Sequence, residues 1–137
     1  MKHLAITLAL LSVVCLVGCD EVKGPYSIGS DKYPAGAYPR NVAVDPQLAN
    51  ALVAGQTRVN GGSKDQPMTV QQPMRNTKNF PLEIQYQFIF LDETGRQLPS
   101  SGAWKNLPME PRVERFLEGA ALDTNAVDWR LTVRPAK

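Results

Sequence analysis

Residues 82–91 read Leu-Glu-Ile-Gln-Tyr-Gln-Phe-Ile-Phe-Leu, and large apolar side chains occupy every second position from Leu82 to Phe90. This period of two predicts a β-strand with one buried face. At about 25 cal/mol per Å² of apolar surface, such a row buries enough area to make this the central strand of the core. Ile89 and Leu91 are also apolar, which indicates that the far end of the strand is covered on both faces.

The segments around this strand predict turns and further short strands. Asp92-Glu93-Thr94-Gly95 is typical of a tight turn in which glycine supplies a positive φ, and residues 96–98 are expected to pair back. Pro73 is expected to place a break or an edge position in its segment. The other expected strands lie within residues 42–44, 57–60, 67–76, 104–107, 112–117 and 127–134.

One segment favours a helix instead. Residues 46–54 begin with Pro46, a good first helical residue, after Asp45 as an N-cap, and Leu48, Leu52 and Val53 share a face. The remaining pattern of short alternating strands predicts an all-β chain, an antiparallel β-sandwich of immunoglobulin-like build. The cysteines of a true immunoglobulin domain are missing, and a small open barrel is the alternative architecture.

The beginning of the chain carries an export and lipidation signal. Leu16, Val17, Gly18 and Cys19 form a lipobox after a cationic start and the apolar run 4–17. This run is shorter than the about 20 residues of a transmembrane helix, so residues 1–18 are predicted to be a lipoprotein signal peptide that is removed. Lipid on Cys19 would then attach the protein stably to a membrane. The alternative is ordinary secretory cleavage beside a chance cysteine.

The two cysteines are not expected to form a disulfide, because Cys15 lies in the discarded apolar run. Residues 19–40, rich in Gly, Pro and Ser, are predicted to be a lipidated flexible tether, and residues 41–137 to be the sandwich domain. Asp20 and Glu21 fit a membrane-sorting signal that retains lipoproteins in the inner membrane of enteric bacteria, although inner and outer membrane stay open. The tyrosines beside prolines are interpreted as linker or edge-docking residues rather than a recognition stripe; they are Tyr26, Tyr33 and Tyr38.

Composition excludes several classes of function. Removal of residues 1–18 takes Lys2 from the 15 basic residues and leaves 14 against 13 acids, scattered along the chain, so no nucleic-acid binding is expected. The single histidine, His3, lies in the signal peptide. Without imidazole the mature chain has no Ser-His-Asp or Cys-His apparatus and no histidine-ligated zinc. No cofactor and no metal are predicted.

The remaining polar groupings favour structural roles. Asp92 and Glu93 are the nearest approach to a carboxylate pair, but a turn explains both residues. Asp123-Thr124-Asn125 lacks the ligand spacing of a calcium loop. Four arginines suggest an anion-binding strip or, as the favoured interpretation, a surface of cross-strand ion pairs. The arginines are Arg112, Arg115, Arg130 and Arg134, and the acids are Glu110, Glu114, Glu118 and Asp128.

The two tryptophans are expected mainly in the core, with an exposed platform for a glycan or protein as the alternative. Trp129 stands in register with Leu131 and Val133, which supports burial. Trp104, Arg130 and Arg134 are the candidate interaction surface if any part of the domain binds a partner.

Four features recur in similar order in one known group of proteins. They are Leu82-Glu-Ile-Gln-Tyr-Gln-Phe-Ile-Phe-Leu-Asp-Glu-Thr-Gly95, Trp104 with Leu107, the Gly-Ala-Ala segment 119–121, and Asp128-Trp129-Arg130-Leu131 ending in Arg134-Pro135. Over residues 50–135 the chain thereby resembles the YcfL-type lipoproteins. The resemblance implies a lipoprotein with an immunoglobulin-like β-sandwich, of uncharacterised role in Gram-negative envelopes, and it brings no catalytic residue. Members are often encoded beside a lipoprotein that activates a peptidoglycan synthase, which implies a connection to the cell wall.

The sequence therefore predicts a membrane-anchored envelope protein that faces the periplasm and acts without catalysis, as a module that binds an envelope protein partner. The alternative is a carboxylate-dependent hydrolase that acts on an envelope polymer. Missing histidines and the lack of a convincing acid pair disfavour that alternative.

Overall fold

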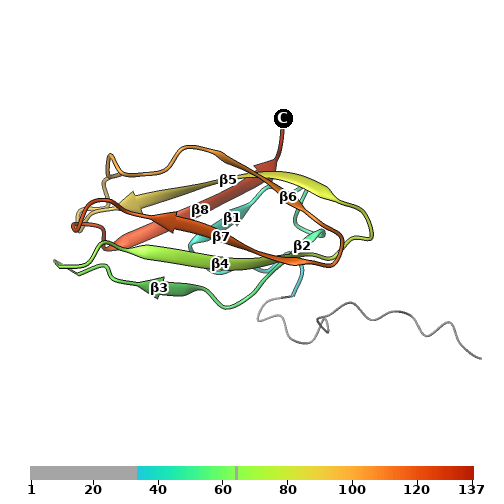
Figure 1. The fold of residues 1–137 in the computed structure, drawn as a ribbon, viewed down its shortest axis with the longest axis horizontal. Helices are drawn as coiled ribbons and strands as arrows, with labels where there is room; N and C mark the ends of the chain where they lie inside the picture. Colours follow the sequence, from blue (N-terminus) through green and yellow to red (C-terminus); the bar gives the residue numbers. More distant parts are fainter. Residues whose placement is uncertain (1–33, 64) are drawn as a thin grey trace, which may run out of the picture.

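The computed structural model describes residues 34–63 and 65–137, which form two β-sheets packed face to face (Figure 1). The predicted signal peptide lies outside the described residues, together with the greater part of the tether. The same is true of Leu16, Val17, Gly18, Cys19, Asp20 and Glu21. In the described ranges no helix is long and apolar enough to cross a membrane.

The described residues form eight strands in two sheets, so the predicted all-β sandwich is confirmed. The first sheet has the order β1-β8-β5-β6, and in the second sheet β4 pairs with β7 on one side and with β2 and β3 on the other. The strands are β1 (Val42–Val44), β2 (Leu52–Ala54), β3 (Arg58–Asn60), β4 (Thr69–Asn76), β5 (Leu82–Leu91), β6 (Lys105–Met109), β7 (Glu114–Ala120) and β8 (Asp128–Pro135).

The alternating strand of the sequence is β5, and its central position is confirmed. It pairs antiparallel with β8 along one side and with β6 along the other. Ile84, Phe88 and Phe90 are almost completely buried, whereas Glu83 is exposed, as the period of two requires. Because β5 carries the largest aromatic row, the core is built on this strand.

One strand pair departs from the expected antiparallel arrangement. β1 runs parallel to β8, with Val42 opposite Leu131 and Val44 opposite Val133. A hairpin forces two neighbouring strands to run antiparallel, but the partner of β1 is far away in sequence and no hairpin joins the two. After β1 the chain crosses to the second sheet, where it continues as β2.

The helix expected at residues 46–54 is wrong. A helical turn does begin there, since the Leu48 N–H donates to the Asp45 carbonyl and the Leu52 N–H to the Leu48 carbonyl. It stops at residue 51, because Leu52–Ala54 form β2 and pair with β4, where all three side chains are buried. Burial and strand pairing thus override a local helix signal that was only one or two turns long.

Pro73 lies in the middle of β4, which is neither broken nor at an edge. Its carbonyl accepts the Gly55 N–H at 2.9 Å. Since the N–H and C=O of a strand residue point to the same side, the missing donor of Pro73 faces the gap between β2 and β3 and leaves the pairing with β7 continuous. The expected break is therefore absent from β4. It corresponds instead to the gap between β2 and β3, which pair with β4 on either side of Pro73.

The two sheets are in close contact where a glycine of one sheet faces an aromatic ring of the other. On β7, a Cβ atom added to Gly119 would lie 2.5 Å from Cγ of Phe88. The Phe88 ring in turn stacks on Phe90 at a centroid distance of 6.3 Å and contacts Trp129 at 6.0 Å. A side chain at position 119 would push this aromatic cluster away from the second sheet.

We predict that Gly119→Ala lowers the free energy of unfolding by about 1–3 kcal/mol, because the added methyl overpacks the core at Phe88. Urea unfolding followed by tryptophan fluorescence measures the change. Gly102→Ala is the matched control, since the nearest atom to its added Cβ lies 3.9 Å away and its backbone is not in the left-handed region. Equal unfolding midpoints for the two variants would contradict the packing argument.

Candidate functional site

Trp104 and Arg134 form a stacked pair on the outer face of the first sheet. The guanidinium carbon of Arg134 lies 3.7 Å from the centroid of the Trp104 ring, and Arg134 Nε donates to Gln85 Oε1 at 3.1 Å. Trp104 is only partly buried. Such stacking of a guanidinium on an indole ring is favourable and holds both side chains in one orientation.

The expectation of a core position is wrong for Trp104 and confirmed for Trp129, which is 7% exposed. The reason lies in the neighbouring Lys105, which pairs with Tyr86 and extends across the edge of the sandwich to the Glu118 carbonyl. Successive side chains of a strand point to opposite faces, so Trp104 is directed outwards.

Near this pair the outer face carries an open hollow of about 450 Å³ over β1, β8 and the end of β5. Arg40 and Arg130 lie at the hollow, and Asp128 is the acidic residue that lines it. Asn41 Nδ2 donates to Asp128 Oδ1 at 3.0 Å and to the Trp129 carbonyl at 2.8 Å, which fixes the chain before β1 against β8. With Arg134 further along β8, the outer face is richer in cations than in anions.

Sequence reasoning missed Arg40, because it was placed at the end of the predicted tether. In the structure the folded domain begins earlier, since the Tyr38 hydroxyl donates to the carbonyls of Ala49 and Leu52 at 2.9 and 3.0 Å. Burial raises the pKa of Tyr38. The tyrosine beside a proline was the available signal for docking on the domain, and it holds Arg40 next to β1.

The four arginines expected to share one surface are divided between the sheets. Arg130 and Arg134 lie on β8, whereas Arg112 and Arg115 lie in and after the connection between β6 and β7. Across the described part of the chain only Arg115 is within ion-pair distance of one of the expected acids, with 3.8 Å to Glu110. One of the expected arginine–acid pairs is therefore within reach, between β7 and the connection that precedes it. Among the described residues the four arginines do not form a continuous strip.

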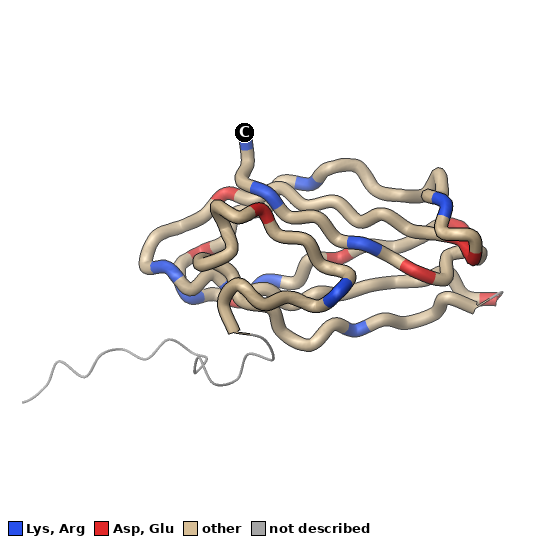
Figure 2. Tube along the Cα trace, turned by 180° about the vertical axis from the view of Figure 1, so that it is seen from behind, with Lys and Arg blue, Asp and Glu red and all other residues tan. Residues whose placement is uncertain are grey.

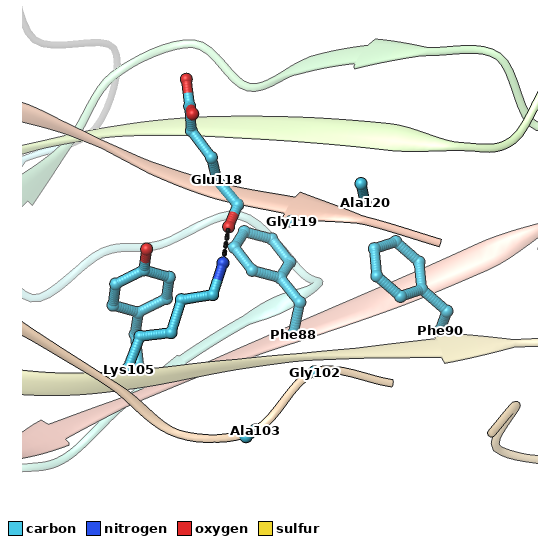
Figure 3. Close-up of a pocket in the computed structure, with 9 residues that line it drawn as sticks. Phe88, Phe90, Gly102, Ala103, Lys105, Glu118, Gly119 and Ala120 are labelled. Carbon is cyan, nitrogen blue, oxygen red and sulfur yellow. Dashed lines mark hydrogen bonds between the residues drawn. The ribbon is translucent and has the colours of Figure 1, made fainter. Parts of the chain in front are cut away.

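A second, smaller pocket of about 50 Å³ lies inside the sandwich edge between β6 and β7 (Figure 3). Phe88 and Phe90 line its interior, and Lys105 Nζ donates to the Glu118 carbonyl at 3.2 Å across its mouth. Burial raises the pKa of Tyr86 at this edge, and a hydrogen bond with the backbone of Glu118 partly opposes the rise. The pocket is well below the about 300 Å³ of a typical small-molecule site, so we interpret it as a sealed edge of the sandwich.

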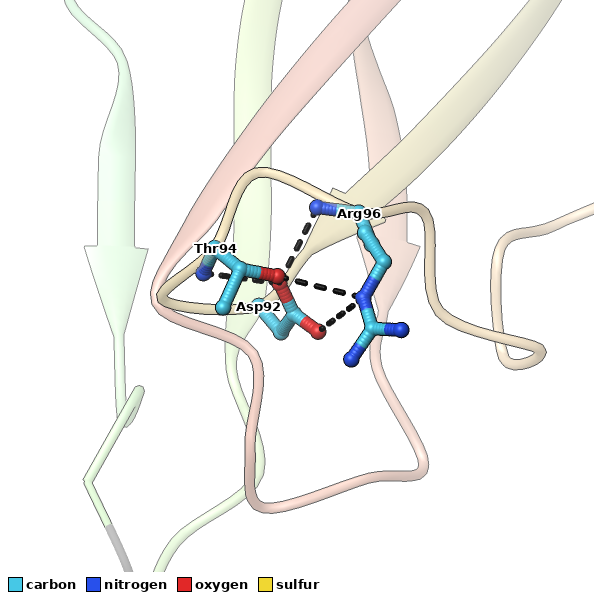
Figure 4. Close-up of polar contacts among 3 residues, drawn as sticks. All are labelled: Asp92, Thr94 and Arg96. Atoms are coloured by element: carbon cyan, nitrogen blue, oxygen red, sulfur yellow. Dashed lines mark hydrogen bonds and ion pairs between the residues drawn. The ribbon is translucent and has the colours of Figure 1, made fainter.

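Asp92 holds the turn that follows β5 (Figure 4). Its Oδ1 accepts hydrogen bonds from the Thr94 N–H at 2.8 Å, from Thr94 Oγ1 at 2.6 Å and from the Arg96 N–H at 3.0 Å. Gly95 has a φ of +77°, as the turn requires. The Thr94 hydroxyl, followed by the Arg96 N–H, lowers the pKa of Asp92. The predicted turn is confirmed. The carboxylate of Asp92, the first residue of the Asp92–Glu93 pair, is engaged in holding this turn.

The positions of the carboxylates show whether the described residues offer a site for metal binding or for acid catalysis. Within residues 34–63 and 65–137 there is no cluster of three or more His, Cys, Asp or Glu that would hold a metal ion. Of the two hollows, the inner is lined by one carboxylate, Glu118, and the outer by one, Asp128. Hydrolysis of a glycosidic bond by carboxylates requires two such groups about 5–10 Å apart, and neither hollow supplies them.

By its fold this chain is a small β-sandwich domain, and the outer face of its first sheet is open and carries arginines. Residues 40–135 match the family described as "Protein of unknown function (DUF1425)", and the chain belongs to this family. No curated protein matches the chain.

Two crystal structures have a similar fold. Campylobacter jejuni cj0090 aligns with a TM-score of 0.60 and 21% identity, over 72% of this chain and 100% of that chain. A DUF1425 family member from Shewanella sp. pv-4 aligns with a TM-score of 0.54 and 17% identity, over 63% of this chain and 79% of that chain. At these identities the likeness concerns the fold alone.

We predict that Thr94→Val raises the pKa of Asp92 towards its ordinary value, because the variant removes the strongest hydrogen bond to the carboxylate. A depressed pKa stabilises the folded state above the ordinary value near 3.8, and this stabilisation is lost as the pH falls through the folded value. NMR titration of the Asp92 carboxyl carbon measures the shift. Thr124→Val, in another exposed connection, is the control; an unchanged Asp92 titration in Thr94→Val would refute the assignment.

Proposed function

We propose that this protein is a lipid-anchored, non-enzymatic binding module of the bacterial envelope. In this proposal residues 1–18 direct export, Cys19 carries the lipid, and the sandwich faces the periplasm. The lipobox Leu16-Val17-Gly18-Cys19 supports the anchor, and the YcfL-type resemblance is compatible with membership of the family of unknown function. The proposed partner is an envelope protein, and the cell-wall connection of the resemblance makes cell-wall assembly proteins the first to test.

The stacked pair of Arg134 and Trp104 is the observation that carries the binding role. Arginine and tryptophan are enriched among the residues that contribute most to protein interfaces. Here the guanidinium is already oriented by the ring and by Gln85, so little side-chain freedom is lost when a partner binds. A rigid sheet with a packed core stands behind the pair.

The charge of this face indicates the chemistry of the partner. Arg40 and Arg130 at the hollow, with Arg134 beside it, outnumber the acids of this face, Asp128 and Glu83. A complementary partner surface therefore carries carboxylates, and its association with this face is weakened by salt.

We predict that Cys19→Ser abolishes lipid attachment and releases the protein from membranes or leaves the unprocessed precursor, because the acylated sulfur is lost. Membrane fractionation and the intact mass of the purified protein measure the result, and density separation shows which membrane holds the unmodified protein. Cys15→Ser is the control and leaves processing unchanged. Normal processing and fractionation of Cys19→Ser would eliminate the anchor.

We predict that a photocrosslinking residue at Thr132, on the outer face, captures an acidic envelope protein in living cells, whereas one at Gln71 on β4 of the second sheet does not. Arg134→Gln is expected to lower the yield about tenfold, corresponding to the loss of a central arginine contact. Arg58→Gln, an exposed arginine of β3, is the matched control and leaves the yield unchanged. Equal yields from both sheets, or no effect of Arg134→Gln, would rule out this face.

A further inference from the structure

Two connections meet at one end of the sandwich and present an exposed aromatic side chain. They are residues 77–81 between β4 and β5, and residues 110–113 between β6 and β7; together they are called the basic end below. Phe80 is 55% exposed at this end. Single exposed apolar residues are common on protein surfaces, so exposure alone does not mark Phe80 as a binding residue. The further evidence is the way in which its turn is held and the charges that surround it.

The first connection is fixed by a fully buried polar residue, Asn76. Its Nδ2 donates to the Phe80 carbonyl at 2.8 Å and to the Met109 carbonyl at 3.1 Å, and its Oδ1 accepts the Lys78 N–H at 2.8 Å. Buried amides with satisfied donors and acceptors rigidify the backbone around them. The backbone on both sides of residue 79 is therefore held, and the Phe80 ring is presented to solvent from an ordered turn.

The second connection is joined to the first by Arg112. Its Nε donates to Asn79 Oδ1 at 2.9 Å, and its φ of +62° places it in the left-handed region that favours glycine. An arginine in this conformation costs free energy that the rest of the turn must offset. The bond to Asn79 keeps the Arg112 cation beside the connection that carries Phe80.

Charge is distributed unequally between the two ends of the sandwich (Figure 2). At the basic end Lys78 and Arg112 accompany Phe80. The acids of this end are Glu110, which lies 3.8 Å from Arg115, and Asp45 in the neighbouring connection 45–51. The connections at the opposite end carry Asp65, Asp92, Glu93 and Asp123 with Arg96 as their described base. A negatively charged surface would thus be repelled less by the basic end than by the other, and Lys78 and Arg112 are the cations that it would meet beside Phe80.

The described chain also starts on the side of the basic end. Tyr38 contacts the carbonyls of Ala49 and Leu52, and the Thr77 N–H donates to the Ala51 carbonyl at 2.9 Å. The residues that follow the proposed tether are therefore linked through one turn to the connection that carries Phe80. A domain held to a membrane from its N-terminal side has this end within reach of the bilayer.

We propose that the basic end docks on an anionic phospholipid surface, with the Phe80 ring in the interfacial region and Lys78 and Arg112 against the headgroups. The proposal rests on the anchoring given under the proposed function. Aromatic rings favour the membrane interface, and Lys and Arg are attracted to anionic leaflets. Phe80 projects from the surface and lines neither of the two hollows, so a deformable bilayer suits it better than a preformed protein surface. Docking leaves the acidic end and the outer face of the first sheet directed towards the periplasm.

The test uses the full chain, purified from membranes in detergent and reconstituted into vesicles that contain lipids brominated on their acyl chains. One set of vesicles is phosphatidylethanolamine with phosphatidylglycerol, and the other is phosphatidylcholine alone. Phe80→Trp places a fluorophore at the basic end, and Leu122→Trp, at a residue 84% exposed near the opposite end, is the matched control. Fluorescence of the unsubstituted chain, with Trp104 and Trp129, is subtracted.

Docking predicts that the Phe80→Trp signal falls by about twofold in anionic vesicles and recovers in Phe80→Trp carrying Lys78→Gln and Arg112→Gln, while Leu122→Trp is unaffected. In neutral vesicles the quenching is weaker. Flotation with the vesicles but equal quenching of Phe80→Trp and Leu122→Trp overturns the docking alone, as it would if Phe80 served a protein partner. Failure of the chain to float with either vesicle overturns both the anchoring and the docking.

Discussion

The contact between the Phe88 ring and Gly119 is the constraint on which the architecture depends. It lets the two sheets approach closely beside the edge formed by β6 and β7, because the glycine has no side chain to hold the aromatic ring away. A pocket of about 50 Å³ lies at this edge and is lined in part by Phe88 and Gly119. Such a pocket is small for a substrate, which supports the proposal that this domain recognises its partners on its surfaces.

Several polar residues are used to build these surfaces. Asp92 holds the turn after β5, and Asn76 and Arg112 fix the connections at the basic end. The proposed partner face and the proposed membrane end are different parts of the sandwich, one a sheet face and the other an end. They are therefore compatible, since a domain resting on its basic end leaves Arg134 and Trp104 accessible.

The fold class was predictable because β5 and β8 alternate so regularly that only strands satisfy both faces. The failures have a common physical cause. Leu52 was assigned to a helix by its local spacing, yet pairing with β4 buries it; the orientation of β1 depends on Leu131, far along the chain. For the candidate site, Arg130 and Arg134 were found from their places on the polar face of β8, whereas Arg40 was missed because contacts made by Tyr38 hold it there.

By itself the sequence determined the alternating strands and the turn at Gly95, and it carries the proposed lipobox ending in Cys19, because each depends on residues next to one another in the chain. Only the tertiary structure decided which strands are neighbours, that Trp104 stacks on Arg134 outside the core, and that Asn79 meets Arg112. These contacts join residues far apart in sequence, and a local pattern carries no information about which distant segment will pack against it.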